Sequence, residues 1–337
     1  MCENDDVAVG NLVNVMFARS KKPIVGIVVQ VYSEMPKEGI RYRQVIDINS
    51  EVSLNEEMVS TAVFLRARYL CRYMEAFSLF LPSGKPSKRG IKRLPYKELA
   101  EKANFTQNLN FELNSEQMRA FSEISEDIIK ENNSIFLIQG ITGSGKTELY
   151  MKSIELAIQK GKNALVLVPE ITLTTQMVLR FAHRFGFKNI AVIHSRLSQG
   201  ERYDEWQRIR NGEVRIVIGA RSAIFAPLEN IGVIVLDEEH EASYKSDQSP
   251  KYETVDVAAK RAKYYNAVLL LGSATPSVVS KKRAFDGIYK PLMLNNRYNG
   301  NKLPKAEIVD MREEIKSGNK HIISKLLYDK METMLKN

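Results

Sequence analysis

A glycine-rich stretch between an apolar run and a helical pattern carries the clearest chemistry in this 337-residue sequence. Residues 135–139 are apolar or β-prone, and Gly140-Ile-Thr-Gly-Ser-Gly-Lys-Thr147 follows them and fits the phosphate-loop pattern G-x-x-x-x-G-K-[ST]. The backbone N–H groups of such a loop, and the positive end of the next helix, bind phosphate oxygens. We therefore expect Lys146 to reach the β- and γ-phosphates of ATP and the Thr147 hydroxyl to ligate Mg²⁺. The other loop residues expected to contact the nucleotide are Gly140, Thr142, Gly143, Ser144 and Gly145.

An acidic cluster follows another apolar run. Residues 233–236 lead directly into Asp237-Glu-Glu-His240. An aspartate at the tip of a buried strand, in the same sheet as a phosphate loop, is where Mg²⁺ is held, and a neighbouring glutamate can polarise the attacking water. The pattern thus predicts catalytic roles for Lys146, Asp237 and Glu238, with Asp237 as a metal ligand. His240 has no second histidine or cysteine nearby, which favours a role in relaying the nucleotide state over a metal site.

Hydroxyl groups follow the next apolar run, 267–271, in Gly272-Ser-Ala-Thr-Pro276. Taken alone, this segment reads as a turn before a helix with a proline near its start. Beside the acidic cluster, Ser273 and Thr275 are expected to bond the acidic strand tip and to couple hydrolysis to motion.

Two further strand ends suit a nucleic-acid backbone. Thr172 and Thr174 open a helix, where hydroxyls and free N–H groups bind phosphates without reading bases. Arg221 and Ser222 follow the apolar run 214–218. Ordinary helix capping by threonine and an arginine in a loop explain the same residues. Gln117 has two interpretations that the sequence leaves open: a capping box with Asn114, or a contact to the adenine edge.

All these residues lie in a segment where expected strands alternate with expected helices. The expected strands are 135–139, 164–168, 190–193, 214–218, 233–236 and 267–271, and the expected helices are 147–160, 172–185, 201–211, 253–264 and 277–285, after one that opens behind Asn114. Strands that are apolar on both faces and alternate with helices predict a parallel sheet wrapped by helices, with ligands beyond the carboxyl ends of the strands.

The first 82 residues differ in pattern. Residues 7–31 read as a hairpin, 41–48 as a further strand and 55–80 as one or two helices, which predicts a small α+β module. Residues 83–97 hold six basic residues and no acid, and their proline and glycine content is that of a linker. Contact with phosphates and simple solvation explain this charge equally well.

Composition fits a globular protein with a polyanionic partner. Apolar residues make up 44% of the chain, the net charge is +9 and the pI is about 9.3. Two cysteines, Cys2 and Cys71, are too few for a disulfide framework or a zinc site. No apolar run approaches the ~20 residues that span a bilayer, and the first charged residues are acidic, so a cytoplasmic protein without a membrane partner is expected.

Taken together, these motifs resemble superfamily II helicases, and most closely the family of primosomal protein N′ (PriA), the bacterial replication-restart helicases. The motifs that carry the resemblance are the phosphate loop, Leu167-Val-Pro-Glu-Ile-Thr-Leu173, Ile218-Gly-Ala-Arg-Ser-Ala223, Asp237-Glu-Glu-His-Glu241 and Gly272-Ser-Ala-Thr-Pro-Ser277. The resemblance implies ATP- and Mg²⁺-dependent 3′–5′ movement on single-stranded DNA and primosome assembly at stalled forks. It implies as partners forked and single-stranded DNA, primosome and replisome-loading proteins, and single-stranded DNA-binding protein.

The resemblance also covers an aromatic loop that is thought to couple DNA contact to ATP turnover. Here it includes Tyr244, Lys245 and Tyr252, and their rings beside a cation would offer stacking faces to an unstacked strand.

The expected architecture is an α/β P-loop (RecA-like) parallel-sheet helicase lobe preceded by a small α+β DNA-binding domain. The expected domains are a partial 3′-end DNA-binding domain (1–82), a basic linker without room for a winged helix (83–112), the ATP-binding lobe (113–290) and the start of a connection to a second lobe (291–337). We expect the chain to stop before that second lobe, its arginine finger and the eight cysteines that hold zinc in the family. Two alternatives remain: a small-molecule P-loop kinase, and a non-catalytic fragment that binds forks and nucleotide.

Overall fold

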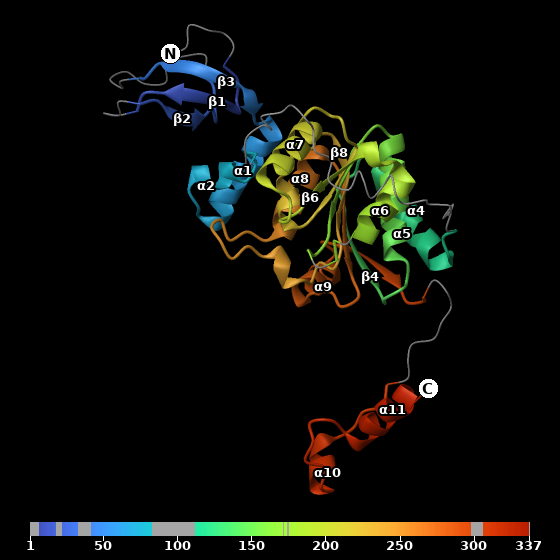
Figure 1. Cartoon of the computed structure of the whole chain (residues 1–337). Coiled ribbons are helices and arrows are strands. Elements are labelled where there is room, and N and C mark those ends of the chain that lie inside the picture. Colours follow the sequence, from blue (N-terminus) through green and yellow to red (C-terminus); the bar gives the residue numbers. More distant parts are fainter. Residues whose placement is uncertain are drawn as a thin grey trace. The chain divides into compact units, whose positions relative to one another are not determined.

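The structure is a computed structural model that describes residues 7–17, 22–32, 42–82, 112–170, 172–173, 175–297 and 306–336 (Figure 1). The basic linker and Thr174, for which the sequence predicts roles, lie outside the described residues. The chain divides into two compact units, 1–298 and 299–337, and each is described by itself. Within the described ranges, no helix has both the length and the apolar character needed to cross a bilayer.

Seven parallel strands form the central sheet, in the order β10-β4-β9-β8-β5-β7-β6. Their bounds are β4 Ile135–Gly140, β5 Asn163–Leu167, β6 Ile190–Ile193, β7 Ile216–Gly219, β8 Ile231–Leu236, β9 Val268–Ser273 and β10 Lys290–Leu294. Six of them are the expected strands, and the parallel α/β architecture predicted from the sequence is confirmed. All seven carboxyl ends meet at one edge, because every pair in the sheet is parallel.

Helices cover both faces of this sheet. Successive residues of each strand point to opposite sides, and the central strands are apolar on both, so both faces must be covered. On β5, Leu165 and Leu167 join one buried cluster, while Ala164 and Val166 join the other. One face is covered by α4 (Ser115–Ile129), α5 (Lys146–Gln159) and α6 (Thr175–Phe185). The opposite face carries α7 (Gln199–Arg210), α8 (Thr254–Tyr265) and α9 (Val278–Phe285). These helices are the ones that the apolar periodicity predicts.

Strand β10 is a correction to the expected domain boundary. The boundary at residue 290 would cut through this strand, which pairs with β4 from Lys290↔Phe136 to Leu294↔Gly140. Only Leu292 and Leu294 of its five residues are buried, since it lies at the edge of the sheet. A short edge strand with so few apolar positions gives little signal in the sequence.

The N-terminal residues begin with a small antiparallel sheet of order β2-β1-β3, from β1 (Asn11–Val15), β2 (Ile24–Ile27) and β3 (Val45–Ser53). The pairing of β1 with β2 confirms the predicted hairpin. Two helices follow, α1 (Glu56–Tyr69) and α2 (Tyr73–Ser78), and both share a buried cluster with the lobe. In Figure 1 they lie beside α7 and α8. The Nε1–H of Trp206 on α7 donates to the carbonyl of Phe80 at 3.0 Å. The two helices therefore pack directly on the lobe.

A buried ion pair ties α1 to α8. The Arg261 guanidinium is fully buried and forms a bidentate pair with Glu57, with Nε–Oε1 at 3.1 Å and Nη2–Oε2 at 2.9 Å. Its remaining N–H groups donate to the carbonyls of Ile224, Ala226 and Leu228. Each buried donor thus has an acceptor, the condition under which a buried pair is tolerated.

Removing one partner of this pair is expected to destabilise the protein strongly. Replacing Glu57 with alanine leaves the Arg261 charge buried without its carboxylate, which costs about 3–5 kcal/mol in the free energy of unfolding. Urea unfolding followed by circular dichroism measures this change. Lys130→Ala removes an exposed i,i+4 ion pair on α4 and serves as the control, with no measurable shift expected. An equally small effect for Glu57→Ala would show that α1 does not depend on this pair.

The second unit contains α10 (Met311–Lys316) and α11 (Lys325–Lys336). The amide of Asn319 links them by donating to Glu314 Oε2 at 2.7 Å and to the Ile323 carbonyl at 2.9 Å. The carboxylate of Glu314 also accepts from the backbone N–H of Lys325.

Candidate functional site

A pocket of about 330 Å³ lies at the carboxyl edge of the sheet. It is lined by Thr142, Gly143, Ser144, Gly145, Lys146, Thr147, Glu148, Arg180, Asp237 and Glu238. The phosphate loop follows β4 and the acidic cluster follows β8, and the sheet places β9 between those two strands. The structure thus brings Lys146 and Asp237, far apart in sequence, to one cavity. All three residues predicted to be catalytic line it.

The conformation and packing of the loop require glycine at several positions. Gly143 and Gly145 have φ of 82° and 83°, in the left-handed region that favours glycine. A Cβ on Gly145 would lie 2.1 Å from Nε2 of Gln117, and a Cβ on Gly140 would lie 2.5 Å from Oγ of Ser144. Gly140 therefore acts behind the loop, and the pocket lining does not include it. A side chain at position 145 would displace Gln117, and a side chain at position 140 would displace the Ser144 hydroxyl.

The residues of this loop fit a phosphate. Lys146 is mostly buried, and its Nζ donates to the Gly140 carbonyl at 2.8 Å. The Ser144 hydroxyl is buried and has no hydrogen-bond partner within the described residues. A buried polar group without a partner is costly unless a ligand supplies one. The Thr147 hydroxyl and the Asp237 carboxylate line the same pocket, and both are hard oxygen ligands of the kind that Mg²⁺ takes.

Gln117 of α4 supports the phosphate loop through its side-chain amide. It is fully buried, and its Oε1 accepts from the Asn114 N–H at 2.9 Å, which completes the capping box of α4. Its Nε2 donates to the Ser144 carbonyl at 2.8 Å. Both ends of the amide are thus used within the chain, and Gln117 does not line the pocket. The capping interpretation is confirmed, and a contact to adenine stays a prediction.

The Asp237 carboxylate is held in a partly buried setting. The hydroxyl of Tyr150 on α5 donates to its Oδ1 at 3.0 Å. Burial raises the pKa of Asp237, and the negative charge of Glu238 raises this pKa further. Gly272 makes room for the contact, because a Cβ there would lie 1.6 Å from the Tyr150 hydroxyl. A bound cation would stabilise the charged form of this Asp237 carboxylate.

The hydroxyl segment meets the acidic cluster through Ser273, and the partner of Ser273 there is His240. Nδ1 of His240 lies 2.7 Å from Oγ of Ser273 and 3.6 Å from Oε2 of Glu238. The Ser273 hydroxyl also accepts from the Thr275 N–H at 2.9 Å. One contact chain therefore runs from Glu238 through His240 to the turn before α9. This geometry suits the coupling role proposed for His240, Ser273 and Thr275.

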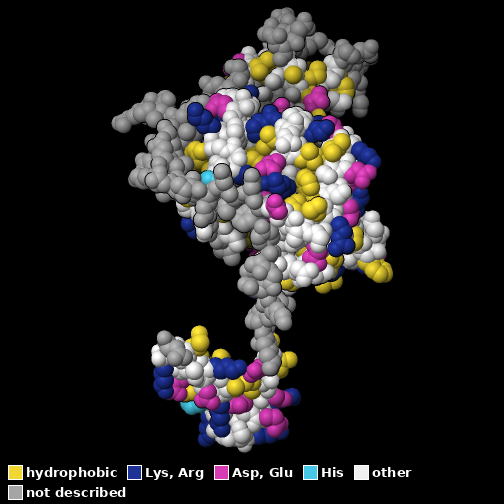
Figure 2. Space-filling model, turned by 90° about the vertical axis from the view of Figure 1, so that its right-hand side faces the viewer, with side chains coloured by type: hydrophobic (Ala, Val, Ile, Leu, Met, Phe, Trp, Pro, Cys, Tyr) yellow, Lys and Arg dark blue, Asp and Glu magenta, His cyan; other side chains and the backbone are white. Residues whose placement is uncertain are grey.

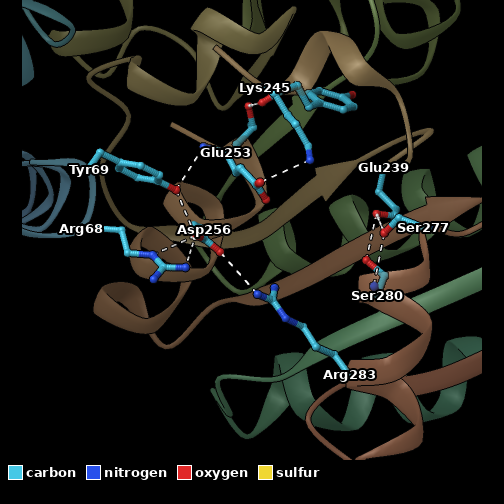
Figure 3. A network of polar contacts seen from close by, with 11 residues as sticks. Arg68, Tyr69, Glu239, Lys245, Glu253, Asp256, Ser277, Ser280 and Arg283 are labelled. Carbon is cyan, nitrogen blue, oxygen red and sulfur yellow. Dashed lines mark hydrogen bonds and ion pairs between the residues drawn. The ribbon is translucent and has the colours of Figure 1, made fainter. Parts of the chain in front are cut away.

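Glu239, which the sequence analysis leaves without a role, anchors α9 (Figure 3). Its carboxylate is buried and accepts from the Ser277 N–H at 2.7 Å and from the Ser280 hydroxyl at 2.9 Å. A carboxylate at a helix N-terminus satisfies donors that the helix itself leaves free. A shift of the 237–240 turn would thus act on α9 directly.

The aromatic loop corrects one expectation. Tyr244 is 3% exposed and Tyr252 4% exposed, so neither ring offers a stacking face in this conformation. The Tyr244 hydroxyl donates to the Asp237 carbonyl at 2.8 Å, and the Tyr252 ring packs edge-on against Phe225 at 5.0 Å. Their apolar rings add more stability inside the core than in water. Only Lys245 of the three is exposed, and it pairs with Glu253 at 3.3 Å (Figure 3).

The remaining DNA candidates lie at strand ends in the same sheet. The Thr172 hydroxyl donates to the Pro169 carbonyl at 2.8 Å, which is an ordinary local hydrogen bond. Thr172 is exposed. Arg221 begins a 3₁₀ turn, Arg221–Phe225, and its Nη1 donates to the carbonyls of Ser243 and Lys245. Ser222 next to it is exposed. Arg221 thus holds the aromatic loop, a contact that sequence spacing does not reveal.

Three residues of the site escaped the sequence analysis. Tyr150 and Glu148 lie on α5 within four residues of Lys146, and Arg180 reaches the pocket from α6. The helical spacing after the loop could have pointed to Tyr150, because residues three or four apart share a helix face, and Tyr150 lies three residues after Thr147 and four after Lys146. Nothing in the sequence around Arg180 marks it.

Charges of both signs are mixed on the face shown in Figure 2. Lysine and arginine side chains alternate there with aspartate and glutamate over the described residues, without separating into halves. Over the described residues of this face, the lysine and arginine side chains thus form no single continuous stripe.

Two protein families match this chain. Residues 110–278 match the family described as "Type III restriction enzyme, res subunit", and residues 1–82 match the "3′DNA-binding domain (3′BD)" of PriA. The replication restart protein PriA of Bacillus subtilis is 52% identical over 220 residues, which cover 65% of this chain and 27% of that protein. The PriA of Rickettsia felis is 36% identical over 330 residues, 98% of this chain and 48% of that protein.

The chain therefore spans between about a quarter and a half of these two relatives. Among solved structures, RecG bound to a three-way DNA junction is 23% identical with a TM-score of 0.42, over 78% of this chain and 34% of RecG.

Proposed function

Because this chain belongs to the PriA family of replication restart proteins, we propose that its α/β lobe binds and hydrolyses ATP to drive 3′–5′ movement on single-stranded DNA. The lobe is of the helicase and ATPase class. The observation that carries the proposal is the convergence of Lys146, Thr147, Asp237 and Glu238 on one pocket. These are the groups that phosphoryl transfer to water needs.

Each residue has a physical role in this proposal. Lys146 and the loop N–H groups bind the phosphates, and the positive charge of Lys146 compensates the negative charge of the phosphate oxygens. Thr147 and Asp237 would hold Mg²⁺, whose charge neutralises the phosphate oxygens when it is bound. Glu238 accepts a proton from the attacking water, because it lines the pocket beside Asp237.

DNA would lie across neighbouring strand ends. Thr172, Thr174, Arg221, Ser222 and Lys245 are the candidate contacts to its backbone. The chain of contacts from Glu238 through His240 to Ser273 supports a coupling of hydrolysis to that strand. Forked DNA, primosome and replisome-loading proteins and single-stranded DNA-binding protein are the partners that membership in the family suggests.

The experiment measures whether nucleotide and DNA affect each other's binding. Fluorescence anisotropy of a labelled oligothymidylate is followed with and without Mg²⁺ and β,γ-imido-ATP, and ATP hydrolysis is measured with and without the same DNA. We expect the nucleotide to change DNA affinity by about 5-fold or more, the range of typical coupling between sites. DNA should raise the rate of hydrolysis.

The alternatives give different results. A small-molecule kinase would bind ATP with no effect of DNA on affinity or on turnover. A non-catalytic fork-binding fragment would show the coupling of binding without DNA-stimulated hydrolysis. Either outcome contradicts the proposed motor.

A further inference from the structure

Arg180 is a cation in the pocket that none of the roles above uses. It lies on α6, its side chain is 42% exposed, and it lines the pocket together with Lys146, Asp237 and Glu238. We propose that Arg180 binds the terminal phosphate of the bound nucleotide, so that the pocket distinguishes a triphosphate from a diphosphate. This inference rests on the proposed function of the pocket.

The present partner of Arg180 is a weak one. Its Nη2 lies 3.8 Å from Oε2 of Glu148, beyond hydrogen-bond distance. Glu148 is 4% exposed, and this same Oε2 is buried without a hydrogen-bond partner within the described residues. A buried carboxylate oxygen that a nearby guanidinium fails to satisfy indicates that Arg180 is not locked in place.

Glu148 does not need Arg180 to stay buried. Arg184, one turn further along α6, donates to Oε1 of Glu148 and pairs through Nε with Glu155 at 2.5 Å. Arg184 is 13% exposed, so it is the residue that fastens α6 to α5. Arg180 can therefore leave Glu148 at little cost, and Glu148 keeps one ion pair.

The position of Arg180 in the pocket favours the terminal phosphate. α6 follows β5, which pairs directly with β8, and Asp237 and Glu238 directly follow β8. Arg180 reaches the pocket beside Glu148 of α5 and lines it together with Asp237 and Glu238. Glu238 is the proposed base for the water that attacks the terminal phosphate, and Arg180 lines the same pocket as Glu238, so its guanidinium can reach that phosphate. A guanidinium matches phosphate oxygens with two parallel N–H donors.

Nucleotide binding separates this role from a purely structural one. Isothermal titration calorimetry with Mg²⁺ gives the affinities of the full chain for β,γ-imido-ATP and for ADP. We expect Arg180→Gln to lower the affinity for β,γ-imido-ATP about 10-fold, since a hydrogen-bonded ion contact to phosphate is lost. The affinity for ADP should stay within about 2-fold, because the contact is absent from the diphosphate.

Two controls make the result specific. Arg119→Gln removes one positive charge from the exposed face of α4, outside the pocket, and should leave both affinities unchanged. Thermal unfolding of Arg180→Gln should match the wild type, because the side chain is 42% exposed and its ion pair with Glu148 spans 3.8 Å, beyond hydrogen-bond distance. A loss of stability would assign Arg180 to structure and overturn the proposal.

The remaining outcomes are distinct. If β,γ-imido-ATP and ADP lose affinity together, or neither does, Arg180 does not read the terminal phosphate and the inference fails alone. If the wild type binds neither nucleotide, or Lys146→Ala binds both as well as the wild type, the proposed function of the pocket itself fails.

Discussion

Replacing Lys146 with alanine is expected to remove most of the protein's affinity for ATP while leaving its fold intact. The Nζ group donates a hydrogen bond to the Gly140 carbonyl, and Lys146 lines the phosphate pocket. A charged hydrogen bond contributes about 1.5–3 kcal/mol, so the affinity for Mg²⁺ with β,γ-imido-ATP should fall about 10- to 150-fold. Hydrolysis should fall to background. Calorimetric titration and a phosphate-release assay measure the two effects.

The loss of affinity must come from the pocket and not from unfolding. Lys152→Ala is the matched control, because Lys152 lies on the same helix, pairs with Glu155 and does not line the pocket. Both variants should unfold at nearly the wild-type temperature. Unchanged nucleotide affinity in the Lys146 variant would show that the loop does not hold phosphates.

Glu238→Gln is expected to separate binding from hydrolysis. Glutamine keeps the size and hydrogen-bonding reach of the side chain but cannot accept a proton from water. General base catalysis contributes about 10²- to 10⁴-fold to a rate, so turnover should fall by this amount. Affinity for β,γ-imido-ATP should stay near the wild-type value, because the groups that hold phosphate and metal remain. Single-turnover hydrolysis, with titration of the non-hydrolysable analogue, tests both parts.

Glu241 provides the control for this second variant. It lies three residues after Glu238 and is absent from the pocket lining, so Glu241→Gln should hydrolyse ATP at the wild-type rate. If Glu238→Gln hydrolysed ATP as fast as the wild type, another group would have to activate the water. If it lost binding as well, Glu238 would belong to the metal or phosphate site.

Much of the fold was predictable because its signals are local. Strands such as β8 consist of apolar residues on both faces, a pattern that only a sheet covered on two sides satisfies. Parallel strands then bring all carboxyl ends to one edge, so the positions of Lys146 and Asp237 in a common site follow from their places after two strands. The edge strand β10 was missed, because three of its five residues are exposed.

The packing of the N-terminal helices was not predictable. Their periodicity predicts helices but does not say which surface covers them. The acceptors of Arg261 lie on α1 and in the segment 224–228, far apart in sequence, and only the folded chain brings them together. A buried charge needs such partners wherever the fold supplies them, and no local sequence pattern indicates which residues they are.

The sequence by itself determined the chemistry of the pocket, because a phosphate loop and an acidic strand tip need particular residue types at fixed spacing. The tertiary structure alone decided which way the other side chains point. Tyr244 and Tyr252 turn inward because Asp237 and Phe225 offer a hydrogen bond and an aromatic contact, and Arg180 enters the pocket because α6 packs beside α5. The direction of a side chain depends on its neighbours in space, and those neighbours come from other elements.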